Sequence, residues 1–194
     1  MDTLNADQAM KYINKLELPP RPTSPFETVD AFKFDFTEAK NQAMIVGSDI
    51  VSFIKGVTPE RREDIVNSSL LAQLAAKKLV NDSTRIYDWY NAYFDVLMNI
   101  GWVVQSRGFD TYTEASENFQ THEAILQVAA SLLGPNAATL AVVKATLAAL
   151  QSLSTNSPWI TLFNRESQSA NTARFQVTLA ETGNDEQLIV CLLY

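Results

Sequence analysis

The chain has 194 residues, 46% of them hydrophobic and 19% charged, which is enough for one large domain or two small ones around a buried core. A formal net charge of −7 argues against a general electrostatic partnership with nucleic acid. One cysteine, Cys191, excludes a disulfide-stabilised scaffold, and no run reaches the roughly 18 uninterrupted apolar residues of a membrane-spanning helix.

The N-terminal region, residues 1–36, is expected to be a short helix followed by a tether. Residues 3–18 have the apolar spacing of an amphipathic helix, and the four prolines between positions 19 and 25 prevent regular structure. The polar, acidic start at residues 1–7 is unlike a signal peptide. We therefore expect a cytoplasmic protein, and export by a route without a classical signal peptide stays open.

Residues 37–155 are predicted to form a helical domain. The apolar spacing predicts a first helix from Thr37 to Gly56. A second helix has a clear start, because Thr58 can cap it and Pro59 suits the first helical position. The basic pairs at its two ends are expected to be solvated: Arg61-Arg62 and Lys77-Lys78.

A third helix is predicted to start near Ser83 and to end at Gly101 or Gly108. Exposed aromatic side chains on such a helix could stack on sugars or bases. However, Trp89 and Tyr93 share one face of the helix, as packing requires. We therefore interpret it as a central helix covered on several sides by its apolar and aromatic residues: Ile86, Tyr87, Trp89, Tyr90, Tyr93, Phe94, Val96, Leu97, Ile100 and Trp102.

Residues 124–153 are predicted to form an apolar helical hairpin. Two helix-compatible arms flank Gly134-Pro135-Asn136, and Lys144 is the one charged side chain between Ala124 and Asn164. Together with Lys144, a hydrophobic seam on the second arm is the candidate surface for a partner or a membrane: Leu140, Val143, Leu147 and Leu150. Beside it runs a row of small residues that we expect to be buried: Ala137, Ala141 and Ala145.

Three interpretations of this hairpin remain open. An arm of about 17 residues measures roughly 25 Å, less than the roughly 30 Å of a hydrocarbon layer. Placing Lys144 at a bilayer centre would cost on the order of 2.5–3.5 kcal/mol. We favour a hairpin buried against the aromatic helix with Lys144 reaching solvent; a conditionally exposed membrane element and a partner-binding groove are the alternatives. In organisation alone, helices with an apolar hairpin followed by strands resemble helical pore-forming toxins.

Residues 156–194 are predicted to form a small antiparallel sheet. Its strands are expected at Trp159–Phe163, Arg174–Leu179 and Gln187–Tyr194, with the second half-buried. The last strand is apolar on both faces. It is therefore expected to be a central strand, or to be followed by further strands of a longer protein, as in a truncated β-sandwich.

The residues carry no catalytic, cofactor or metal signature. His122 is the single histidine, no Gly-x-Ser-x-Gly motif occurs, and the ligand spacing of a zinc site is absent. Chemistry based on carboxylates alone is a weaker hypothesis that would use Asp82, Asp88 or Asp95. We interpret Asp88 and Asp95 instead as the one solvated stripe of the third helix.

The sequence therefore predicts an α+β protein. The leading hypothesis is a non-enzymatic interaction or effector-type protein that acts through a protein-binding surface or by self-association. The second is a membrane-active, toxin-like protein with residues 124–153 as its insertion element, and the third is an enzyme that uses carboxylates. We expect no cofactor, no nucleic-acid partner, and a membrane only conditionally.

Overall fold

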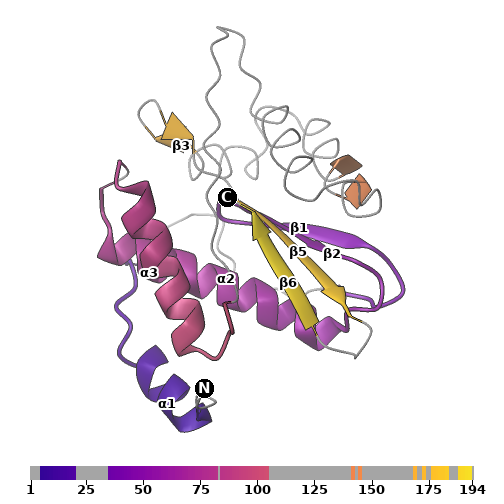
Figure 1. Cartoon of the computed structure of the whole chain (residues 1–194), viewed down its shortest axis with the longest axis horizontal. Helices are drawn as coiled ribbons and strands as arrows, with labels where there is room; N and C mark the ends of the chain where they lie inside the picture. Colours follow the sequence, from indigo (N-terminus) through magenta and orange to yellow (C-terminus); the bar gives the residue numbers. More distant parts are fainter. Residues whose placement is uncertain are drawn as a thin grey trace, which may run out of the picture. The chain divides into compact units, whose positions relative to one another are not determined.

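The computed structural model of the chain describes residues 5–20, 35–82, 84–104, 141–142, 144–145, 168–169, 172–173, 176–183 and 188–193 (Figure 1). These residues show helices together with a small mixed sheet, which confirms the α+β class. The chain divides into two compact units, residues 1–36 with 63–105 and residues 37–62 with 106–194. The first contains α1 (Ala6–Ile13), α3 (Ile86–Asn99) and most of α2 (Pro59–Leu79).

The second unit contains the strands. In a four-stranded sheet they follow the order β1 (Gln42–Val46), β2 (Asp49–Phe53), β5 (Gln176–Thr182) and β6 (Leu188–Leu193). A separate pair consists of β3 (Gln168–Ser169) and β4 (Thr172–Ala173). The predicted domain boundaries at residues 36 and 155 stay a prediction.

The helix predicted from Thr37 to Gly56 is wrong, because this segment forms the antiparallel hairpin β1–β2. Its two-residue connection begins with Gly47 at φ 60°, a conformation that suits a tight hairpin turn and interrupts any helix. The flanking runs are rich in β-branched residues, which favour strands. Helical spacing of the apolar positions was therefore a misleading signal here.

Two C-terminal strands occur close to their predicted places, but their surroundings differ from the prediction. β5 pairs in parallel with β2 and antiparallel with β6, so the sheet is mixed rather than antiparallel. Figure 1 shows β1 and β2 from the early part of the chain in one sheet with β5 from the late part. From Gln176 to Ala180 every residue of β5 is buried, so the half-buried strand is also wrong.

Of the two alternatives expected for β6, the described strands do not show the central position. Among the described strands β6 pairs only with β5 and is therefore an edge of the described sheet. β1 is the other edge. The predicted strand Trp159–Phe163 lies outside the described residues.

The ends of the helices follow their capping signals. At the start of α2, the Arg61 N–H donates to Thr58 Oγ1 at 3.4 Å, which confirms Thr58 as the cap. At the end of α3, the N–H groups of Gly101 and Trp102 donate to the carbonyls of Met98 and Leu97, a Schellman arrangement. Gly101 has φ 109°, so α3 ends at the earlier of the two predicted stops.

The core of the helical unit contains an aromatic cluster on α3. The Tyr93 ring stacks on Trp89 at 5.5 Å and 15°, and it meets Phe94 edge to face at 5.6 Å. These three side chains and Tyr90 are buried, which confirms α3 as a packed helix rather than an exposed stacking surface. The Tyr93 hydroxyl donates to Ser69 Oγ on α2 at 3.4 Å.

The N-terminal helix is shorter than the predicted 3–18. α1 begins at Ala6, where Asn5 Oδ1 accepts from the Asp7 N–H at 3.2 Å. It ends at Ile13, with Asn14 as its C-cap residue, six residues before Pro19.

Candidate functional site

The predicted hairpin surface lies largely outside the described residues. Leu140, Val143, Leu147 and Leu150 are not described, whereas Lys144 is helical and exposed. Ala141 and Ala145 are exposed and Val142 is buried, so the predicted burial of the small-residue row is wrong at these two positions. No helix among the described residues is long and apolar enough to span a membrane.

Arg62 forms the densest set of polar contacts in the described part of the sheet unit. Its Nε donates to the Val57 carbonyl at 2.8 Å, and one terminal nitrogen donates to Gln42 Oε1 at 2.7 Å. The other terminal nitrogen donates to the carbonyls of Lys40 and Ile54 at 3.0 and 3.2 Å. The first turn of α2 is thereby tied to the open end of the β1–β2 hairpin, where β1 begins and β2 ends.

The environment of Arg62 is the opposite of the solvated one predicted for it. Its side chain is 0% exposed, and its guanidinium carbon lies 5.2 Å from the centre of the Phe53 ring. Burial lowers the pKa of Arg62, and the negative charge of Glu38 partly opposes this. Lys77 and Lys78 at the other end of α2 are exposed, as predicted.

A row of buried polar side chains crosses the two central strands. Asp49 on β2 lies opposite Gln176 on β5 in the parallel register, and Thr178 lies two residues further on the same face. All three are at most 2% exposed. The Thr178 hydroxyl donates to Asp49 Oδ2 at 2.8 Å, which partly compensates the burial of this carboxylate.

Of these three buried side chains, Gln176 has the fewest hydrogen bonds. Both polar atoms of its side-chain amide are buried without a hydrogen-bond partner. Replacing Gln176 with leucine is therefore expected to leave the free energy of unfolding unchanged or to raise it by up to about 1 kcal/mol. Urea unfolding measures this, and a loss of stability would show that the amide has a polar partner such as a buried water.

Thr178→Val provides the matched control for that variant. Valine has nearly the shape of threonine but cannot donate to the Asp49 carboxylate, so a loss of about 1.5–3 kcal/mol is expected. A free energy of unfolding that falls in Thr178→Val but not in Gln176→Leu would distinguish a buried polar group that has a hydrogen-bond partner from one that has none.

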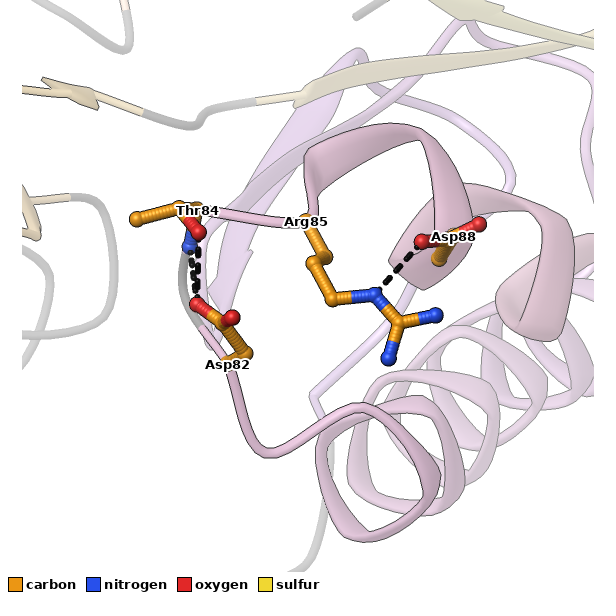
Figure 2. Close-up of polar contacts among 4 residues, drawn as sticks. All are labelled: Asp82, Thr84, Arg85 and Asp88. Atoms are coloured by element: carbon orange, nitrogen blue, oxygen red, sulfur yellow. Dashed lines mark hydrogen bonds and ion pairs between the residues drawn. The ribbon is translucent and has the colours of Figure 1, made fainter.

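Two of the carboxylates considered for catalysis, Asp82 before α3 and Asp88 in its first turn, are occupied locally (Figure 2). The N–H and the hydroxyl of Thr84 donate to Asp82 Oδ1 at 2.9 and 2.7 Å. Arg85 Nε donates to Asp88 Oδ2 at 2.7 Å, an exposed pair of small energetic weight. Asp88 and Asp95 are exposed, in agreement with the predicted solvated stripe.

The Thr84 contacts stabilise the charged form of Asp82. The Thr84 hydroxyl and then its N–H hold the pKa of Asp82 below the ordinary value, so this contribution to stability is present above that value and is lost as the pH falls through the lowered pKa. Thr84→Val is expected to move the pKa of Asp82 upward, with the N–H bond still preventing full recovery. A carbon-detected NMR titration measures the pKa of Asp82. Arg85→Gln is the control, because Arg85 lowers this pKa less than Thr84 does, and it should shift the pKa by a smaller amount. An unchanged pKa of Asp82 in Thr84→Val would contradict the role of the Thr84 hydroxyl.

The edge strand β6 is the remaining feature that bears on function. It pairs with β5 over six consecutive residues without a bulge, and the segment Leu188–Leu193 contains no charged residue and no proline. Ile189 is 48% exposed and Val190 is half-buried. Edge strands of natural proteins usually carry a charge, a proline or a bulge that discourages pairing, and β6 carries none.

Two further findings concern metal binding and similarity to known proteins. In the part of the chain that the structure describes, no three His, Cys, Asp or Glu side chains gather closely enough to hold a metal ion. Comparison of the chain with models of protein families, with curated proteins and with solved structures finds no match. Any functional assignment therefore depends on the chain's own residues.

Proposed function

We propose that this chain is a non-enzymatic interaction protein whose β6 edge accepts a strand from a protein partner. The observation that supports the proposal is an uncharged, unbulged strand at an edge of the described sheet. Along such an edge, every second residue directs its N–H and C=O away from the sheet, and an added strand satisfies these groups.

Exposed apolar surface on the same strand supports the same mode of binding. Ile189 is one of the large hydrophobic residues with nearly half of its side-chain surface exposed. In strand addition, backbone hydrogen bonds provide affinity, and alternate side chains provide selectivity. The exposed Ile189 side chain would contact such a strand and favour an apolar residue there.

Ile189→Lys tests this proposal against a matched control, Leu79→Lys. Leu79, at the end of α2, is 66% exposed, so both variants exchange an exposed hydrophobe for the same charge. We expect the immobilised wild type and Leu79→Lys to retain the same protein from an extract of the producing cells, and Ile189→Lys to lose it.

Hydrogen exchange on the recovered complex completes the test. Binding should slow exchange of backbone amides in β6, because an added strand accepts hydrogen bonds from them. Equal retention by all three proteins, or unchanged exchange in β6, would contradict strand addition at this edge.

A further inference from the structure

We infer that two threonine side chains of β5, Thr178 and Thr182, fix the register of the parallel pair β2–β5. The Thr178 hydroxyl donates to Asp49 Oδ2 at 2.8 Å, and the Thr182 hydroxyl donates to the Gly56 carbonyl at 2.9 Å. Asp49 is the first residue of β2, and Gly56 follows its last residue by three positions. The two contacts therefore hold β5 near both ends of β2, and this inference does not depend on the proposed function.

The pair β2–β5 has no short connection that could set its register. A two-residue turn joins β1 to β2, and turn length determines the register of such a hairpin. More than one hundred residues separate β2 from β5 along the chain. Contacts between distant residues must therefore choose the alignment of these two strands.

The backbone and the burial of the paired residues do not choose one alignment. Side chains alternate between the two faces of a sheet, so a slip of two residues keeps each side chain on its own face and restores the backbone ladder. All residues of β2 are buried, and so are those of β5 from Gln176 to Ala180. A slip of two residues therefore exchanges one buried neighbour for another.

The two threonine contacts oppose slips in opposite directions. A slip of two residues moves β5 about 7 Å along β2. Thr178 already lies two residues past Gln176, the partner of Asp49, so a slip toward the end of β2 would place it four residues past Asp49 and break its hydrogen bond. A slip toward the start of β2 would instead carry Thr182 away from Gly56. Of these three alignments, only the observed one keeps both contacts.

The Thr178 contact has the larger weight of the two. Asp49 and Thr178 are 0% and 2% exposed, and a hydrogen bond to a carboxylate in a buried site is stronger than one between neutral groups. Thr182 is half-buried and its acceptor is a neutral carbonyl. Because β6 pairs with β5, the same contacts also set how far along the sheet the β6 edge lies.

Thr178→Val and Thr182→Val test the inference, because valine has nearly the shape of threonine but cannot donate. Saturation-transfer NMR of the isotope-labelled full chain detects minor states at the β5 amides. We expect Thr178→Val to raise the population of a second, strand-like state about tenfold or more, and Thr182→Val to raise it less. Thr178→Ser keeps the hydroxyl and should show no more of this state than the wild type.

The measurement separates the choice of register from a contribution to stability alone. A Thr178→Val variant that is less stable but shows a single strand-like state at its β5 amides would overturn the inference. So would a minor state with the carbon chemical shifts of an unfolded chain, or equal populations in Thr178→Ser and Thr178→Val. Thr182→Val against Thr182→Ser provides the same comparison at the half-buried contact if Thr178→Val does not fold.

Discussion

Replacing Arg62 with alanine is expected to lower the free energy of unfolding by about 3–5 kcal/mol, because one buried and three part-buried acceptors lose a donor and the fully buried side chain leaves a cavity. Three of these acceptors are backbone carbonyls, of Lys40, Ile54 and Val57, and the fourth is the side chain of Gln42.

Two companion variants separate the geometry of Arg62 from its charge. Arg62→Lys keeps the charge but replaces a planar fork with a single ammonium group, so an intermediate loss is expected. Lys78→Ala removes a positive charge from an exposed position of the same helix and should change stability by less than about 0.5 kcal/mol. Urea unfolding followed by circular dichroism measures all three, and an Arg62→Ala variant as stable as Lys78→Ala would contradict the structural role.

Tyr93→Ala is expected to have an effect of similar size in the helical unit, about 3–5 kcal/mol. Tyr93 is 2% exposed and lies between the rings of Trp89 and Phe94, so removal of its ring leaves a cavity and breaks two aromatic contacts. Thermal unfolding followed by near-ultraviolet circular dichroism would report both the loss of stability and the loss of fixed aromatic packing.

Tyr93→Phe and Tyr87→Ala are the controls. Tyr93→Phe keeps the ring and loses one long hydrogen bond to Ser69, so it should cost no more than about 1 kcal/mol. Tyr87 is on the same helix but 59% exposed, and its replacement should cost about 0.5 kcal/mol or less. Equal losses for Tyr93→Ala and Tyr87→Ala would show that the cluster does not hold this unit together.

Local signals predicted the start of α2 and one of two possible ends of α3. Thr58 and Pro59 mark the start of α2, and Gly101 marks the end of α3, because capping depends on residues within one turn. The aromatic residues of α3 were assigned to a core for the same reason, since their spacing alone places them on adjoining faces. Local signals failed between residues 37 and 56, where short apolar runs suit a helix and a strand equally well.

The candidate site could be predicted much less completely. Arg61 and Arg62 are neighbours of the same type, and no local property shows that Arg62 enters the interior. The alternation of Gln176 and Thr178 was visible, but the strand that lies against them was taken for a helix, so their burial and the Asp49 contact were missed. The hydrophobic seam of the predicted hairpin, apart from Lys144, stays a prediction.

The amino-acid sequence by itself determined the α+β class, the start of α2 and the strand character of β5 and β6, because these depend on capping, turn residues and hydrophobic spacing within a few positions. Only the tertiary structure decided that β2 pairs with a strand more than one hundred residues later, that Arg62 is buried, and that β6 lies at an edge. Strand order and the burial of a charge depend on contacts between distant segments. The apolar run of β6 indicates a strand in either position, and its neighbours distinguish a core strand from a binding edge.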